Sequence, residues 1–153
     1  MQDKIFMKIP NSIRAEHNAI HSALVEATQA PGKVGLAAKE LAQVLHPHFE
    51  REEQIALPPL GLLAALAAGD KLPDEVRSEA LTMTNSLRAE LPRMIEEHKP
   101  IRAAVEKLRT VVRAEGLLKY EQLAEQLALH AQTEEEVLYP AAVLAGDVIR
   151  MRK

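Results

Sequence analysis

Apolar residues recur every three or four positions over most of this chain, which is the spacing of one face of an α-helix. Turn-forming glycine and proline residues interrupt the pattern at 29–32, at 58–59 and at Gly116. No run of alternating polar and β-branched residues predicts a strand. Four main helices are predicted, at about 11–28, 34–56, 73–113 and 117–139. The fold class is therefore all-α, and the short connections favour an antiparallel up-down-up-down four-helix bundle.

Prolines set the expected bends and ends of these helices, because proline lacks the backbone N–H that a helix interior needs. Pro47 predicts a kink in the second helix, and Pro92 and Pro100 predict bends or a break in the third. Pro140 is expected to end the fourth helix. Short extra helices are expected after the second and fourth helices, over 60–68 and up to Arg150.

The two halves of the chain repeat each other. A shift of 82 residues aligns the second helix with the fourth, and a shift of 81 aligns the first with the third. The polar residues that coincide are His48 with His130, Glu52 with Glu134, and Glu16-His17 with Glu97-His98. One domain is therefore predicted over 1–153, with a core of about 11–140 built from two helix-pair repeats, 11–58 and 92–140.

A histidine interrupts the apolar face of every main helix. Glu52 and Glu134 lie one turn beyond two of these histidines, on the same faces. The full set is His17, His48, His98 and His130, with Glu52 and Glu134. Burying a carboxylate without a partner is so unfavourable that it takes up a proton or binds a cation. The pattern favours a metal site over a network of hydrogen-bonded core histidines, whereas His46 and Glu50 share a polar face and are predicted at the surface.

Composition limits the chemistry of such a site. The chain has 47% hydrophobic residues, six histidines, no cysteine and a net charge of −3. Absent thiols exclude disulfides, iron–sulfur clusters, thiolate zinc sites and thiol catalysis, so any metal is held by nitrogen and oxygen. The mixed charge gives no basic field for nucleic acid. The longest apolar stretch, 55–69, is short and contains prolines, so no membrane span is expected, and the predicted location is cytoplasmic.

In combination, these motifs resemble the hemerythrin family, specifically its HHE cation-binding domains. The resemblance covers about residues 11–140 and includes the helix endings Ala56-Leu57-Pro58 and Leu138-Tyr139-Pro140. It implies a left-handed antiparallel bundle that holds two non-heme iron ions, with manganese or zinc as other possible occupants. The implied metal ligands are His17, His48, Glu52, His98, His130 and Glu134. By the same resemblance both glutamates bridge the metals, with His17 and His48 on one ion and His98 and His130 on the other.

His21 is a candidate further metal ligand because it lies one turn after His17. The alternative is a partly exposed residue at the edge of the apolar face. Hemerythrins that carry oxygen have their His-x-x-x-His pair on the third helix, where this chain has Arg102. Arg102 is expected either to leave an open coordination position or to pair with Glu106.

Three further polar residues lie close to the predicted ligands. Gln126, one turn before His130, is a candidate to contact a small molecule bound at the metals. Glu53 and Glu135 each follow a ligand glutamate by one residue, which turns them about 100° away from it. They are interpreted as solvated rather than as acceptors for the outer nitrogens of the histidines.

The resemblance implies a protein that binds or senses O2, NO or redox state. Two alternatives stay open at this point: a di-iron oxidoreductase acting on peroxide, NO or O2, and a non-catalytic interaction module in which the metal stabilises the fold. The expected partner is a small diatomic or peroxide ligand at the metal centre, a protein partner is left open, and neither nucleic acid nor membrane is expected.

Overall fold

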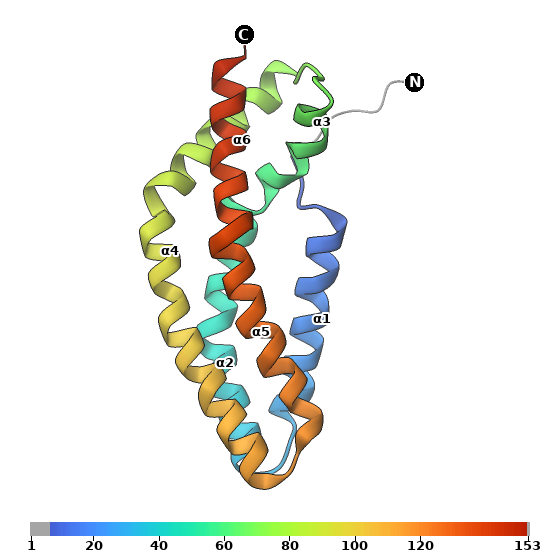
Figure 1. The fold of residues 1–153 in the computed structure, drawn as a ribbon, viewed down its shortest axis with the longest axis vertical. Helices are drawn as coiled ribbons and strands as arrows, with labels where there is room; N and C mark the ends of the chain where they lie inside the picture. Colours follow the sequence, from blue (N-terminus) through green and yellow to red (C-terminus); the bar gives the residue numbers. More distant parts are fainter. Residues whose placement is uncertain (1–6, 153) are drawn as a thin grey trace.

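The computed structural model describes residues 7–152, and within this range it consists of helices and short connections, without a β-strand. The long helices run side by side along the molecule (Figure 1). They are α1 (Asn11–Thr28), α2 (Gly32–Arg51), α4 (Asp74–Glu115) and α5 (Glu121–Thr133), which continues into α6 (Tyr139–Met151). The predicted all-α class and the helical bundle are confirmed. Residues 1–6 and 153 of the predicted single domain lie outside the described range.

The connections between consecutive long helices are of two kinds. A sharp turn joins α1 to α2, and another follows α4 at the same end of the bundle (Figure 1). Gly116 ends α4 in the left-handed conformation, at φ 70°, where its lack of a Cβ avoids strain. The longer connection from α2 to α4 contains a 3₁₀ turn, Pro58–Leu62, and the short helix α3 (Leu63–Ala67).

Two apolar clusters hold the bundle together on either side of a polar layer. The cluster nearer the sharp turns includes the buried residues Ile20, Leu41, Leu108 and Leu127. The second cluster includes Leu57, Leu87, Met94 and Tyr139. Each fully buried Leu, Ile or Met side chain contributes about 1.5–3 kcal/mol to stability. The clusters therefore fix the positions of the four helices that carry the predicted ligands.

The prolines inside α4 do not break it, so of the predicted bends or break only bending is seen (Figure 1). Helix α4 runs unbroken for 42 residues with Pro92 and Pro100 inside it, although its ribbon is curved (Figure 1). Buried residues continue along α4 on both sides of the prolines, so packing offsets the lost backbone hydrogen bonds. The extra helix predicted after the fourth is present as α6, but it follows the π-helical turn directly, without a connection. Pro140 lies in the first turn of α6, where a missing N–H is tolerated.

A π-helical turn begins at each of the two predicted ligand glutamates. The segments are Glu52–Ala56 after α2 and Glu134–Leu138 between α5 and α6. In the first, the Leu57 amide donates to the Glu52 carbonyl at 2.9 Å, the wider i to i+5 bond of a π-turn. Both repeats thus carry the same local distortion. Such insertions are common at functional sites because they change the direction in which side chains leave the helix.

Candidate metal centre

Six titratable side chains meet in the polar layer between the two apolar clusters. Each is at most 4% exposed. The histidines come from α1, α2, α4 and α5, and each glutamate is the first residue of a π-helical turn. The six are His17, His48, Glu52, His98, His130 and Glu134.

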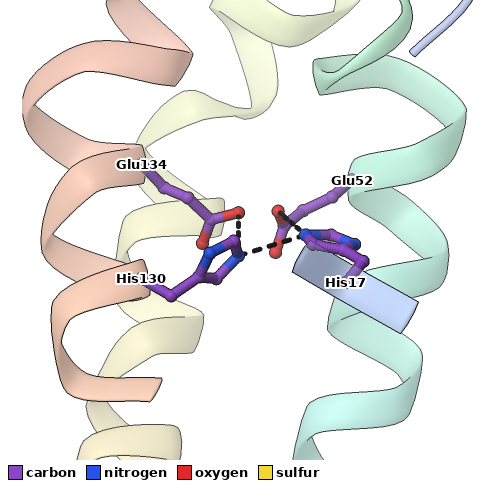
Figure 2. Close-up of side chains that lie close together, drawn as sticks. All are labelled: His17, Glu52, His130 and Glu134. Atoms are coloured by element: carbon purple, nitrogen blue, oxygen red, sulfur yellow. Dashed lines mark hydrogen bonds and ion pairs between the residues drawn. The ribbon is translucent and has the colours of Figure 1, made fainter. Parts of the chain in front are cut away.

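One group of donor atoms forms around His17 and His130 (Figure 2). Their Nε2 atoms are 3.1 Å apart. Oε2 of Glu134 lies 3.3 Å from Nε2 of His130, and Oε2 of Glu52 lies 3.9 Å from Nε2 of His17. Two nitrogens and two oxygens therefore converge on one point, each from a different helical segment.

A second group forms around His48 and His98 from the same two glutamates. The Nε2 atoms of these histidines are also 3.1 Å apart. Oε1 of Glu52 lies 2.6 Å from Nε2 of His48, and Oε1 of Glu134 lies 3.3 Å from Nε2 of His98. Glu52 and Glu134 thus contribute one oxygen to each group.

The donor atoms are spaced as ligands of one ion would be. Two ligands at about 2.1 Å from a metal are about 3.0–3.4 Å from each other, depending on the angle between them. Both nitrogen pairs fall in this range. Among the described residues, both oxygens of Glu52 and Oε2 of Glu134 accept no hydrogen bond, although His48 Nε2 lies 2.6 Å from Oε1 of Glu52. Buried carboxylates in this condition need a cation.

Every histidine of the site also has a carboxylate beside its outer nitrogen, Nδ1. Glu135 lies 2.8 Å from His98 Nδ1, and Glu97 lies 3.4 Å from His48 Nδ1. Glu53 lies 3.7 Å from His17 Nδ1, and Glu16 contacts His130 Nδ1. The interpretation of Glu135 as solvated is wrong, since its carboxylate contacts the His98 ring. Arg102 pairs with the same carboxylate at 3.0 Å, in place of the suggested pair with Glu106.

These outer carboxylates determine whether the inner nitrogen, Nε2, carries a proton or a lone pair. A neutral imidazole that donates its Nδ1 proton to a carboxylate carries a lone pair on Nε2. The facing Nε2 atoms then direct two lone pairs at the same point, an arrangement that repels unless a cation occupies it. Nitrogen and carboxylate donors of this kind suit iron, manganese and zinc. The residues present therefore fit a pair of divalent metal ions.

Burial and neighbouring charges shift the pKa values of the site toward the metal-binding form at two histidines, and away from it at the third histidine and at Glu52. Burial, together with the nearby His130 and Arg14, lowers the pKa of His17 to about 3. Burial also lowers the pKa of His98, whereas it raises the pKa of Glu52. For His48, burial acts to lower the pKa, but the carboxylates of Glu52 and Glu97 raise it above the usual value. Neutral histidines are the form that binds metals.

The structure brings together all six residues that the resemblance implies as ligands, but it corrects their pairing. His17 lies with His130, and His48 lies with His98. The implied pairs, His17 with His48 and His98 with His130, are wrong. The reason is tertiary: α1 packs against α5 as well as α2, and α2 packs against α4, so each donor group draws on a different pair of helices.

His21 and Gln126 are not brought to the donor groups. Both are exposed. The buried line of α1 passes through His17, Ile20 and Leu24, which leaves His21 at the rim of a separate pocket. The buried line of α5 passes through Leu123, Leu127 and His130, so Gln126 faces a surface pocket beside Lys119 and Tyr120. The assignments of His21 as ligand and Gln126 as small-molecule contact do not fit this arrangement.

Two aromatic residues at the site escaped the sequence prediction. Phe49 stacks on the His17 ring with centroids 4.2 Å apart and planes 12° apart. Tyr139 is fully buried, with its hydroxyl oxygen 3.2 Å from His48 Nε2 and 3.3 Å from His98 Nε2. The available sequence signal for Tyr139 is its place in the second repeat, where the first repeat has Leu57.

Comparison with known proteins assigns no family to this arrangement. No family model matches the chain, and neither a curated protein nor a solved structure matches it at a significant level. Within residues 7–152, none of the helices is both long and apolar enough to cross a membrane. The geometry of the buried histidines and glutamates is therefore the basis for any statement about function.

Proposed function

We propose that this chain is a hemerythrin-like protein that holds a non-heme di-iron centre and binds or senses O2, NO or redox state through it. The sharing of Glu52 and Glu134 between two donor groups carries the proposal. Paired metal ions in proteins lie about 3.5–4 Å apart, a separation that the two oxygens of one carboxylate span. An up-down-up-down arrangement of α1, α2, α4 and the α5–α6 rod is part of the same proposal.

A small cavity beside the histidines supports the choice of ligand. It has a volume of about 10 Å³ and touches His48, His98, His130 and Glu134. The rest of its wall is mainly apolar, with Leu45, Phe49, Ile101, Leu127 and Ala131. A reduced iron pair, when bound, would supply the electron density that O2 or NO needs to bind to a metal. The protein contributes the apolar part of the cavity wall, which disfavours water at that face.

The test is anaerobic reconstitution with Fe(II), metal analysis, and absorption spectroscopy during exposure to O2 or NO and after its removal. We expect iron at both positions of each chain and a reversible change in absorption. Failure to retain iron would contradict the metal centre, and irreversible oxidation would contradict reversible binding. Sustained consumption of peroxide, NO or O2 above that of free iron would favour the di-iron oxidoreductase instead.

A matched pair of variants distinguishes the effect of a buried site glutamate on iron content from that of an exposed one. Glu52→Gln removes a shared carboxylate, and we expect it to reduce bound iron. Glu50→Gln changes an exposed glutamate on the same helix that also lies one turn after a histidine, His46, and we expect it to leave bound iron unchanged. Equal iron contents in the two variants would contradict the role of Glu52.

A further inference from the structure

The two metal positions differ in one respect that the repeat does not explain. The Tyr139 hydroxyl oxygen lies 3.2 Å from His48 Nε2 and 3.3 Å from His98 Nε2. Those nitrogens are 3.1 Å from each other. Three donor atoms at nearly equal mutual distances are spaced as three ligands of one ion are. The phenol oxygen therefore belongs to the donor group of His48 and His98.

The other position has a different surrounding. A shift of 82 residues places Tyr139 on Leu57, a fully buried residue without a donor atom. The Phe49 ring stacks on His17 and meets His130 edge-on, with centroids 5.8 Å apart in the second contact. Tyr139 thus introduces a polar group beside one donor group, whereas Leu57, the equivalent residue of the first repeat, has none.

Hydrogen bonding alone accounts poorly for the place of Tyr139. A buried tyrosine normally finds a partner for its hydroxyl. When both histidines donate Nδ1–H to their outer carboxylates, which is the form that binds a metal, the hydroxyl faces two Nε2 lone pairs. One O–H can donate to one of these acceptors at a time, which leaves the other facing an oxygen lone pair. A cation shared by the oxygen and both nitrogens removes that conflict.

We propose that the phenol oxygen of Tyr139 is a fifth protein donor to the metal held by His48 and His98. The inference rests on the proposed metal centre. The O–H bond breaks as the oxygen–metal bond forms, and the proton is released to solvent, as happens when other protein ligands bind metals. The His17–His130 position keeps four protein donors.

The test uses the protein loaded with Fe(III), because a phenolate bound to ferric iron gives a charge-transfer band in visible light. The chain has two tyrosines, so Tyr120→Phe is a matched control for Tyr139→Phe. Tyr120 lies in the 3₁₀ turn Leu118–Tyr120 just before α5, in the cluster nearer the sharp turns. We expect the band in the native protein and in Tyr120→Phe, and its complete loss in Tyr139→Phe with iron content unchanged.

Resonance Raman spectra of the native protein, excited within the band, provide a readout that does not depend on the folding of a variant. Tyrosinate ring vibrations are the expected result. Iron at both positions without a visible band, or a band that survives in folded Tyr139→Phe, would contradict Tyr139 as a metal ligand. Neither result would contradict the metal centre itself. Absence of bound iron in the native protein would overturn both, and metal analysis of the same samples distinguishes the two failures.

Discussion

Glu52 and Glu134 lie 82 residues apart in the chain, yet each places one carboxylate oxygen in both donor groups of the polar layer. The arrangement follows from the repeat, because each glutamate is one turn beyond a histidine and begins a π-helical turn. Both side chains are almost fully buried, and three of their oxygens accept no hydrogen bond within residues 7–152. The two glutamates are therefore expected to lower the stability of the folded protein without metal and to raise it when metal is bound.

Glu52→Gln should stabilise the metal-free protein. Burial raises the pKa of Glu52, which shows that its charged form is disfavoured in the fold. Replacing the carboxylate by a neutral amide of the same shape removes that penalty, and we expect the free energy of unfolding at pH 7 to rise by about 1–3 kcal/mol. Urea denaturation in the presence of a chelator measures the change. Addition of metal should then stabilise the variant less than the native protein.

Glu50→Gln is the control for this comparison, since the Glu50 side chain is 63% exposed. We expect its stability to match that of the native protein both with and without metal. A Glu52→Gln protein that is less stable than Glu50→Gln in the absence of metal would show that the carboxylate contributes to the fold itself.

Glu135→Gln should weaken metal binding more than Glu53→Gln. Glu135 lies 2.8 Å from His98 Nδ1, whereas Glu53 lies 3.7 Å from His17 Nδ1 and is more exposed. A carboxylate that binds the outer nitrogen of a ligand histidine orients the ring, and its loss typically reduces metal affinity by about 10–100-fold. Competition with a chromophoric chelator for Zn(II) measures both affinities. Equal losses would mean that net charge, not orientation of His98, is what matters.

Much of the site follows from the sequence because helix geometry acts over short distances. The i, i+4 spacing places His48 and Glu52 on one face without any knowledge of the fold, and the repeat does the same for His130 and Glu134. Helix geometry also explains why His21 is not at the site, because the buried face of α1 passes from His17 to the residue three positions later. The buried line of α1 turns through Ile20, so the residue after it faces outward.

What the sequence could not predict depends on contacts between helices. The pairing of His17 with His130 requires knowing that α1 and α5 are neighbours. The unbroken course of α4 through Pro92 and Pro100 depends on packing of its buried residues, which local propensity does not describe. The π-helical turns have no sequence signature that periodicity detects, although each one sets the position of a shared glutamate.

The metal-free protein should lose stability as the pH falls, and His17 should account for a defined part of the loss. Its pKa is about 3 in the folded state and about 6.5 when unfolded. Between these values the unfolded chain binds a proton that the folded chain does not, so acid favours unfolding. From pH 7 to pH 5 the contribution of His17 is about 2 kcal/mol.

Comparison of variants isolates this contribution from the other titrating groups. Urea denaturation at pH 7 and pH 5 should show a smaller loss of stability for His17→Gln than for the native protein, by about 2 kcal/mol. His46→Gln changes a histidine that is 67% exposed, and its loss should equal that of the native protein. A His17→Gln protein with the native pH dependence would rule out a neutral, buried His17.

Phe49→Ala should speed the access of small ligands to the metal centre. Leu45 and Phe49 line both the cavity at the histidines and an outer, mainly apolar pocket of about 140 Å³ that opens beside His21 and His46. Phe49 therefore separates solvent from the site, and its ring is held in place by stacking on His17. Removing the ring joins the two spaces. Lowering the barrier to passage by about 1.4 kcal/mol raises the rate about tenfold.

Stopped-flow mixing of Fe(II)-loaded protein with NO measures the association rate. Val25→Ala is the matched control, because Val25 lines the outer pocket but not the inner cavity. We expect faster association in Phe49→Ala, an unchanged rate in Val25→Ala, and equal iron contents in both. Since the ring blocks the path without contributing a donor atom, the equilibrium affinity for NO should change less than the rate. An unchanged rate in Phe49→Ala would show that ligands reach the metals by another route.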